Sequence, residues 1–440
     1  MNLADSLNLG CACSTLDAQQ LRAELETSPA LRGLVDRLAL SHPHLFASTA
    51  VFLDPQTRDE IAQAVATLDR VCALPAWQNH ALKDADEQTC LNRGPQGVFM
   101  GYDFHLSAEG PRLIEINTNA GGAFLNAALA RAHRACCAAM PALMDPDGEL
   151  DRTEAVIVDM FRHEWQAQRG ARPWRNVLIV DDAPEAQYLA PEFALARDLF
   201  AAQGLHAVVA DARELQWRDG ALWHPALPAD QPVDLIYNRL TDFALSQPGH
   251  AALRSAWAAD AVVLTPHPRA YTLAADKRRL IDLSDRDRLE ALGVDPADRQ
   301  QLLRVVPATM AVTAENAEAL WARRRELFFK PTTGFGARAA YRGDKLTQRV
   351  WREILTGDYV AQALVPPSER LVNVNGQTQR LKLDLRAYAY RGQVQLLAAR
   401  TWSGQTTNFR TEGGGFSPVV VLPDFLPSDG PAVSMSPDAT

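Results

Sequence analysis

A lysine followed at once by a hydroxyl- and glycine-rich turn stands in the run LFFKPTTGFGAR, residues 327–338. An apolar strand is expected to end near Lys330, which adds a positive charge where glycines let backbone N–H groups approach an oxyanion. The turn residues that we expect to contact phosphate are Thr332, Thr333, Gly334 and Gly336. The spacing differs from the GxxxxGK[ST] pattern of a Walker A loop, and a plain hairpin turn is an equally good interpretation.

Two carboxylates and an amide form a second group, because Asp103 and Glu115 lie on two predicted strands and Asn117 follows Glu115 by two positions. Side chains alternate along a strand, so Glu115 and Asn117 share a face, opposite the apolar Ile114 and Ile116. Such hard oxygen ligands suit Mg²⁺, or Mn²⁺ in its place, with positions left for phosphate oxygens. The alternative interpretation is a solvated hairpin face with incidental acids.

An aspartate and several arginines make up a third group near the C-terminus. Asp384 and Arg386 share one face of a predicted strand, and Arg400 ends the next strand. In the loop that follows, Asn408 and Arg410 precede three consecutive glycines. Clustered arginines often mark a solvated face. In an acidic protein, an arginine-rich loop beside a phosphate turn is also a good place to bind a carboxylate or a transferring phosphoryl group.

The elements that must position the second group follow from a change of period. Residues 1–94 are expected to form a helical N-terminal segment, because apolar residues recur at three- to six-residue steps over 16–90. Near Gly94 the pattern becomes that of a hairpin. The expected elements are strands at 97–105 and 112–117, the turn 107–110 and a helix over 123–139. We therefore assign residues 95–150 to a metal-binding unit.

From about residue 172 the chain alternates short apolar runs with helical stretches, which predicts a parallel sheet with helices on its faces. The expected elements are strands at 177–180, 207–210, 234–237 and 261–264 and a helix over 186–203. We therefore assign residues 172–267 to a small α/β domain.

The elements that must position the other two groups lie in residues 270–425. A helix is expected at about 273–283, and short strands are dense after it, which is the plan of an α+β unit. The expected elements are strands at 327–330, 337–342, 359–364, 382–390, 394–400 and 419–422 and a helix over 345–355. The tail 426–440 is rich in Pro, Ser and Asp and is expected to be loose.

The composition excludes several classes of function. Lys and Arg total 44 against 53 Asp and Glu, and this net charge of −9 argues against nucleic acid or an anionic membrane as the main partner. No stretch reaches the roughly 18–20 uncharged residues of a membrane span, and the start does not have the pattern of a secretory signal, so we expect a cytoplasmic protein. The six cysteines are too few and too irregularly spaced for a disulfide framework.

Taken together, the three groups resemble the ATP-grasp ligases. In that family a lysine that follows an aspartate and a second lysine on a strand contact the nucleotide phosphates, and Lys277 and Lys330 resemble that pair. The turn 332–338 resembles the flexible glycine loop, and 359–365 resembles the hinge strand that offers its backbone to adenine. The resemblance implies further ATP contacts at Gln362, Ala363, Leu364, Asp384 and Asn408. It also implies Mg²⁺ ligands at Asp103, Glu115 and Asn117.

The order of these segments resembles a circular permutation, because the metal segment precedes the lysine strand by about two hundred residues. That order is similar to the glutathionylspermidine synthetase-like branch, with 172–267 in the place of a Rossmann-like pre-ATP-grasp domain. The resemblance covers roughly 95–125 and 172–422 and implies an ATP-grasp fold assembled from two separated segments. An arginine that is common two positions before the metal aspartate is replaced by Gly101. The catalytic candidates that remain are Arg386, Arg400 and Arg410.

The activity that the resemblance implies is that of an ATP-dependent carboxylate–amine ligase. The terminal phosphoryl group of ATP passes to a substrate carboxylate, and an amine attacks the acyl phosphate with release of ADP and phosphate. A small-molecule or peptide acid and an amine acceptor are the expected partners. The alternatives are a kinase on the same scaffold and a nucleotide-binding partner protein without turnover. Arg239, just past a predicted parallel strand, is either a substrate contact or a surface arginine that caps a helix.

Overall fold

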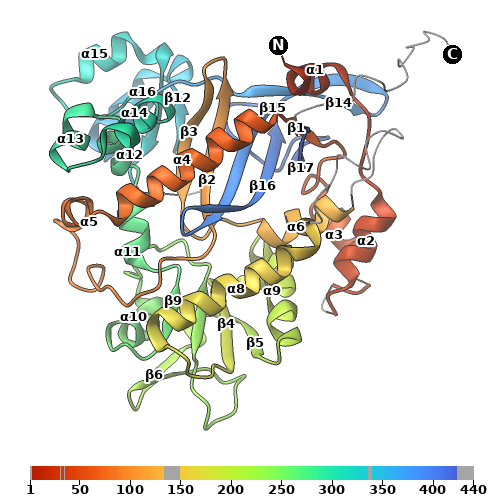
Figure 1. Cartoon of the computed structure of the whole chain (residues 1–440), viewed down its shortest axis with the longest axis vertical. Coiled ribbons are helices and arrows are strands. Elements are labelled where there is room, and N and C mark those ends of the chain that lie inside the picture. Colours follow the sequence, from red (N-terminus) through yellow and green to blue (C-terminus); the bar gives the residue numbers. More distant parts are fainter. Residues whose placement is uncertain (1, 30, 34, 133–148, 335–338, 424–440) are drawn as a thin grey trace.

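The computed structural model describes residues 2–29, 31–33, 35–132, 149–334 and 339–423. Gly336 with the rest of the predicted loop segment 335–338, the predicted helix beyond residue 132, and the tail 426–440 lie outside the described residues. In the view of Figure 1 a large mixed sheet occupies the upper part and a smaller parallel sheet the lower part, with helices packed on both.

The large sheet is built from both ends of the chain. Its strands, in spatial order, are β1 (Val51–Leu53), β17 (Gly415–Val421), β16 (Gln393–Trp402), β15 (Gln377–Tyr390), β2 (Met100–Ser107) and β3 (Gly110–Asn117), and β14 (Ser368–Val374) also pairs with β15. The pair that joins the early hairpin to the late strands is antiparallel β2–β15.

The two faces of the large sheet differ because apolar and polar side chains alternate along β15. Leu383, Leu385 and Ala387 belong to the core under α4 (Pro55–Ala73), the helix that crosses the sheet in Figure 1. The residues between them, Asp384 and Arg386, are polar and lie on the opposite face. That face carries the candidate site.

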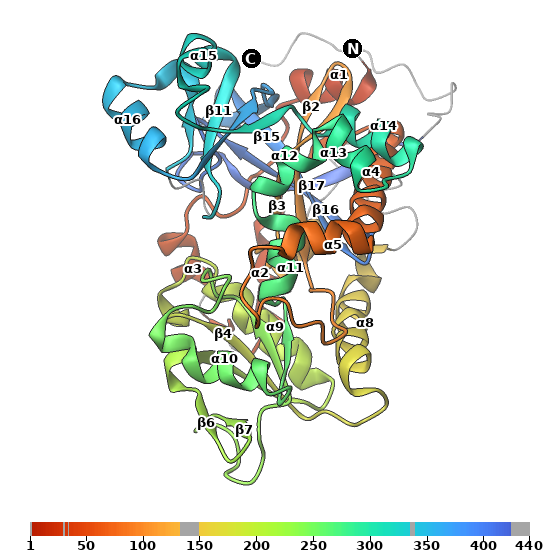
Figure 2. The same ribbon diagram turned by 90° about the vertical axis from the view of Figure 1, so that its left-hand side faces the viewer.

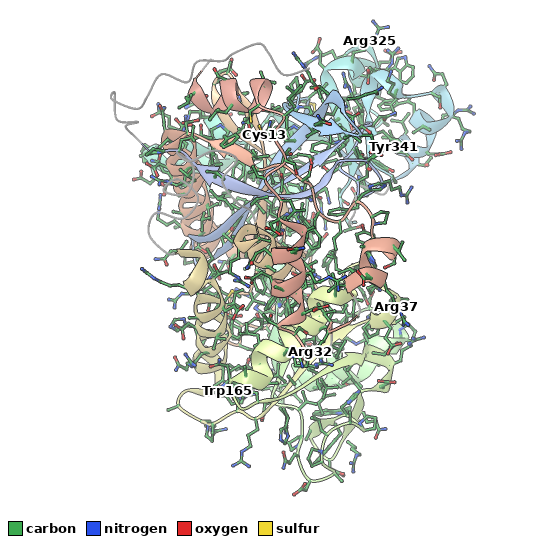
Figure 3. The ribbon with its side chains drawn as sticks, turned by 90° about the vertical axis from the view of Figure 1, so that its right-hand side faces the viewer. Cys13, Arg32, Arg37, Trp165, Arg325 and Tyr341 are labelled. Carbon is green, nitrogen blue, oxygen red and sulfur yellow. The ribbon has the colours of Figure 1, made fainter. Side chains whose placement is uncertain are left out.

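The smaller sheet is parallel, as the alternation of apolar runs and helices predicts. Its strands, in spatial order, are β5 (His206–Asp211), β4 (Asn176–Asp181), β8 (Leu235–Asn238) and β9 (Val263–Thr265). Its helices are α8 (Glu149–Arg169), α9 (Ala190–Ala202) and α10 (Ala251–Ala258), and a short hairpin joins β6 (Gln216–Arg218) to β7 (Ala221–Trp223). The Trp165 indole, labelled in Figure 3, donates to the Arg172 carbonyl oxygen at 2.6 Å and so ties the end of α8 to the chain entering β4.

A third, antiparallel sheet lies at the upper edge of Figure 2 and carries the lysine strand. Its strands, in spatial order, are β10 (Thr309–Ala311), β13 (Tyr359–Ala363), β11 (Leu327–Pro331) and β12 (Tyr341–Arg342). The helices of this region are α11 (Pro268–Ala270), α12 (Arg278–Leu283), α13 (Arg286–Ala291), α14 (Pro296–Val305), α15 (Ala317–Ala322) and α16 (Gln348–Thr356). Phe329 and Trp351 form the centre of its core.

The N-terminal segment differs from the expected all-helical plan. Its helices are α1 (Leu3–Gly10), α2 (Ala18–Glu26), α3 (Val35–Ser41), α4 and α5 (Pro75–Leu82). Between α3 and α4, however, β1 pairs in parallel with β17. Three fully buried apolar residues are too few to show a period, so the strand is not visible in the sequence pattern. The helix α6 (Ala123–Arg131) follows the β2–β3 hairpin. Among the described residues no helix has the length and apolar character needed to cross a bilayer.

Candidate active site

The β2–β3 hairpin carries a bulge. Around it, the Ile114 carbonyl oxygen and the Asp103 side chain meet residues from the late part of the chain. Asp103 pairs with Glu115 across the hairpin, and the register then shifts, so Ile114 has no partner on β2. The Ile114 carbonyl oxygen accepts a hydrogen bond from Lys330 Nζ at 2.5 Å. On the other side of β2, Asp103 pairs with Arg386 of β15. Residues far apart in the sequence thus meet around one hairpin.

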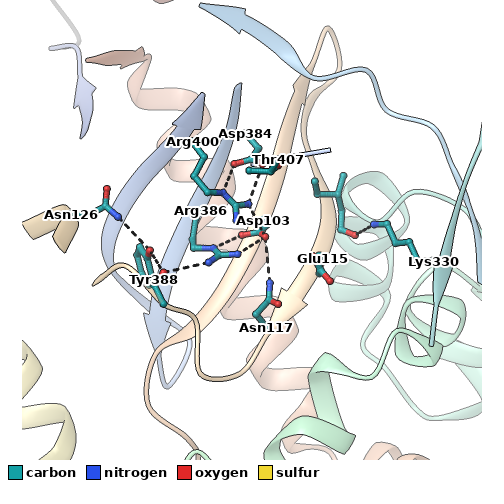
Figure 4. A network of polar contacts seen from close by, with 12 residues as sticks. Asp103, Glu115, Asn117, Asn126, Lys330, Asp384, Arg386, Tyr388, Arg400 and Thr407 are labelled. Carbon is teal, nitrogen blue, oxygen red and sulfur yellow. Dashed lines mark hydrogen bonds and ion pairs between the residues drawn. The ribbon is translucent and has the colours of Figure 1, made fainter. Parts of the chain in front are cut away.

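Asp103 lies at the centre of a polar network on the face of the large sheet (Figure 4). Arg386 donates to both of its carboxylate oxygens, from Nε at 2.6 Å and from Nη2 at 2.7 Å. Arg400 donates from Nη2 to Asp103 at 2.9 Å and from Nε to Asp384 at 2.8 Å, and the Asn117 amide donates to Asp103 at 3.3 Å. Burial acts to raise the pKa of Asp103, but the two guanidinium groups outweigh it and hold that pKa well below its ordinary value.

Two buried lysines and a carboxylate lie beside this network. Lys277 Nζ is 3.0 Å from Glu115 Oε1 and donates to the Gly334 carbonyl oxygen at 3.1 Å. Lys330 Nζ donates to Gln362 Oε1 at 2.8 Å as well as to the hairpin. Burial, with Lys277 adding to it, lowers the pKa of Lys330 to about 8 even though Glu115 acts to raise it. Burial acts to raise the pKa of Glu115, but Lys277 and then Lys330 outweigh it and lower that pKa.

A cavity of about 990 Å³, part of it open to solvent, joins these groups. The residues predicted from the sequence that line it are Glu115, Lys277, Lys330, Gly334, Gln362, Ala363 and Leu364. Lining residues that the sequence did not single out include His105, Phe328, Arg342, Lys382 and Trp402.

The donors in this cavity fit a nucleotide. Gln362 is 2% exposed, and while its Oε1 accepts from Lys330, its Nε2 has no hydrogen-bond partner. A buried donor without a partner is costly unless a ligand satisfies it. The backbone of the predicted hinge strand has fewer donors to offer a ligand, because the N–H groups of Ala363 and Leu364 already donate to other carbonyl oxygens of the chain at 2.8 Å.

The other predicted nucleotide contacts lie outside the cavity lining. Thr332 is held by Asp358, whose carboxylate accepts from its hydroxyl at 2.7 Å. Thr333 lines a neighbouring cavity that also includes Gly334. Asn408 bonds within its own loop, and Asp384 accepts from Arg400 and Thr407. Arg410, the third catalytic candidate, is an exposed residue of that loop.

The predicted metal ligands are together, but they differ in the oxygens that they offer. Glu115 Oε2 and Asn117 Oδ1 have no hydrogen bond to another described residue, so both are free to coordinate. The oxygens of Asp103, in contrast, already accept four hydrogen bonds. Across the described ranges no cluster of three His, Cys, Asp or Glu is arranged to hold a metal. The residues present therefore fit Mg²⁺ through two oxygens completed by phosphate, a coordination that Mg²⁺ often has in proteins.

Arg239 is not a surface residue, because it is 7% exposed. It donates to the Asn119 carbonyl oxygen at 2.7 Å and lies 3.8 Å from Glu192. Glu192 in turn accepts the Gly122 N–H at 2.8 Å. The loop that follows Asn117 is therefore fixed from the parallel sheet. The sequence placed Arg239 after a strand but gave no sign of this contact.

His105 and Trp402 form the part of the cavity wall that sequence reasoning missed. Their rings are stacked with centroids 6.3 Å apart. His105 follows Asp103 by two positions, so strand alternation places both on the same face of β2. That alternation was the available signal for His105. Trp402 ends β16 two residues after Arg400, and the same rule applies to it.

The described chain shares its fold with a glutathione synthetase-like effector (GSS30) from Globodera pallida in its apo form. The two are 11% identical with a TM-score of 0.53, and the match covers 92% of this chain and 98% of that chain. A putative γ-glutamylcysteine synthetase from Methylobacillus flagellatus KT is 9% identical with a TM-score of 0.45, covering 92% of this chain and 88% of that chain. No family model and no curated protein sequence matches the chain. At these identities the likeness is one of fold, and the fold is that of a glutathione synthetase-like protein.

Proposed function

We propose that this protein is an ATP-dependent carboxylate–amine ligase of the ATP-grasp type. The observation that carries the proposal is one cavity in which Glu115 of the early hairpin meets Lys277 and Lys330 of the late segment. The fold shared with a glutathione synthetase-like protein supports it. ATP is then a substrate whose phosphates lie near the two lysines, with the unpartnered Gln362 amide toward the base. Because ATP is consumed, we also propose the cytoplasm as the place of action.

The chemistry that the chain's own groups supply is positioning and charge neutralisation. Lys277 and Lys330 meet phosphate oxygens, and burial keeps these contacts away from water. Glu115 and Asn117 are the residues that would hold Mg²⁺, whose charge, when it is bound, stabilises the oxygens that crowd together during phosphoryl transfer. The acid accepts the phosphoryl group, and the amine then displaces phosphate from the acyl phosphate.

The cavity that adjoins Gly334 is the proposed place for the acid and the amine. Gly334 lines both cavities, so a substrate there lies next to the phosphate end of the nucleotide cavity. The wall of this neighbouring cavity, which also includes Thr333, combines the stacked rings of Phe243 and Tyr271 with charged side chains such as Asp276 and Arg278. Such a mixed wall suits small zwitterionic or peptide substrates. The permuted order of the segments further supports the glutathionylspermidine synthetase-like branch as the proposed relative.

The test is ADP release from ATP and Mg²⁺ with a panel of acids and amines, followed by mass detection of an amide. We expect turnover that Glu115→Gln reduces at least a hundredfold. The matched control is Glu109→Gln, which makes the same change at an exposed position of the same hairpin and should act like the wild type. A stable phosphorylated acid without amide would indicate the kinase. Nucleotide binding with no ADP release across the panel would indicate a partner protein without turnover.

A further inference from the structure

The carboxylate of Asp103 is largely occupied by hydrogen bonds from its protein partners. Arg386 contributes two hydrogen bonds to it, Arg400 one and Asn117 one. Three of these hydrogen bonds fall on Oδ2 and one, from Arg386 Nε, on Oδ1, so of the roughly four lone-pair sites of an ionised carboxylate only one, on Oδ1, is left. Asp103 is also 1% exposed, which leaves little room to rotate away from its partners. Glu115 differs on both points, because its side chain is 27% exposed and one of its oxygens is free.

The two arginines use the same edges of their guanidinium groups for these contacts. Arg386 spends Nε and Nη2 on Asp103, and its Nη1 reaches only the Gly121 carbonyl oxygen at a long 3.5 Å. Arg400 spends Nε and Nη2 on Asp384 and Asp103, and its Nη1 has no hydrogen bond to any described residue. Each arginine thus keeps Nη1 as a donor. Because planar guanidinium groups are rigid, fixing two nitrogens also fixes the third.

The backbone of β2 makes room for this arrangement at Gly101. A Cβ atom at that position would lie 2.4 Å from the Ala120 Cβ, and 3.6 Å from Arg386 Nε. No side chain therefore stands at 101, and the Arg386 guanidinium passes beside it. Tyr388 lies two positions after Arg386 on β15, and its hydroxyl donates at 2.8 Å to the carbonyl oxygen of Gly121, the residue that follows Ala120.

We propose that Asp103 is a positioning residue that aims Arg386 and Arg400 at an oxyanion, and that it is not a metal ligand. The oxyanion is the transferring phosphoryl group or the substrate carboxylate, and in this respect the proposal rests on the proposed function. With Asp384 the four side chains are electrically neutral together, so the arginines supply directed donors, while Lys277 and Lys330 supply net charge. The metal is then held by Glu115 and Asn117 without Asp103.

The test measures metal binding separately from turnover. Binding of Mn²⁺ in the presence of AMPPNP is followed by electron paramagnetic resonance in Asp103→Asn and in Glu115→Gln. We expect Asp103→Asn to leave the Mn²⁺ dissociation constant within twofold of wild type and to lower kcat at least tenfold with little change in the KM for ATP. Glu115→Gln should raise the Mn²⁺ dissociation constant at least tenfold. An equal rise in Asp103→Asn would overturn the assignment.

A second variant keeps the test decisive if Asp103→Asn does not fold. Arg386→Gln leaves Asp103 in place but removes its main partner. We expect lower kcat and an unchanged Mn²⁺ dissociation constant. If Asp103 were a ligand held back by Arg386, the same variant would bind Mn²⁺ several times more tightly, and the proposal would be rejected. Wild-type protein that binds no Mn²⁺ with AMPPNP would instead refute the proposed function, and this result cannot be confused with the other two.

Discussion

Glu115 and Lys277 form an ion pair in the candidate site. In the proposed complex a phosphate would bind Lys277 and a metal ion would bind Glu115, so the pair would be separated. Their atoms are 3.0 Å apart. A nucleotide without metal must take Lys277 from its partner and leave the Glu115 charge next to phosphate, which is unfavourable. We therefore expect Glu115→Gln to bind metal-free ADP about fivefold more tightly than wild type, equivalent to roughly 1 kcal/mol. Calorimetry in EDTA measures this, and the same variant should bind ADP with Mg²⁺ more weakly.

Lys330 gives the site a pH dependence whose sign can be worked out. Burial lowers its pKa from 10.5 to about 8. Between these values the unfolded chain holds the proton and the folded chain does not, so the Lys330 contribution to stability rises with pH. Phosphate needs the charged form, so nucleotide affinity should fall by up to tenfold per pH unit above 8. Calorimetry in buffers of different ionisation enthalpy should show proton uptake at pH 8.5, and Lys330→Arg should abolish it. Constant affinity from pH 7.5 to 9 would contradict this.

Residue type and spacing were enough to select Glu115 and Lys330, because each stands at a fixed position on a predictable strand, whereas Lys277 and Gln362 were selected through the resemblance to the ATP-grasp ligases. The sequence could not show how Asp103 is used. Its partners Arg386 and Arg400 come from strands almost three hundred residues away. A carboxylate bound to metal and one bound to arginine are identical in sequence, and only the tertiary contacts distinguish them.

At the scale of elements, the loop after β3 is held by a buried ion pair from the parallel sheet. Arg239 reaches Asn119, and Glu192 accepts the Gly122 N–H. Burial raises the pKa of Glu192, and Arg239 opposes this. We expect Arg239→Met to lower the free energy of unfolding by about 3–5 kcal/mol, because it leaves a buried carboxylate without its cation. Urea denaturation measures the loss, and the double variant with Glu192→Gln should recover part of it. Additive losses would show that the two residues are not coupled.

Elements with a clear period were predictable, and short ones were not. The four parallel strands follow from short apolar runs that alternate with helical stretches, and their register confirms them. β1 was missed because its three apolar residues stand alone among helical stretches, so no alternation of strands and helices marks them. The bulge at Ile114 was missed for another reason. The extra residue shifts the alternation of buried positions by one, so Leu113 and Ile116 are both buried, but the adjacent apolar residues Leu113 and Ile114 do not reveal where the shift occurs. The bulge nevertheless aims the carbonyl oxygen that accepts from Lys330.

At the scale of the whole molecule, the site exists only because two distant segments form one surface. The early hairpin adds its strands to the edge of β15, and the lysine strand β11 reaches the hairpin through Lys330. A ligand in this cavity therefore contacts both segments at once. Strand β5 of the parallel sheet and the separate β6–β7 hairpin contribute no residue to the cavity lining.

Hydrogen exchange can test this assembly in the intact chain. Binding in the cavity should stabilise the backbone around every group that it orders, so AMPPNP with Mg²⁺ should slow amide exchange at least tenfold in 110–117 and in 327–334 together. Exchange in 206–223 should not change, because that region is remote from the cavity. Glu115→Gln should remove the protection in 110–117, since in the proposed site the metal held by Glu115 joins the hairpin to the phosphates, whereas 327–334 should keep part of it. Protection of the late segment alone would mean that the hairpin takes no part in nucleotide binding, and the two-segment site would have to be given up.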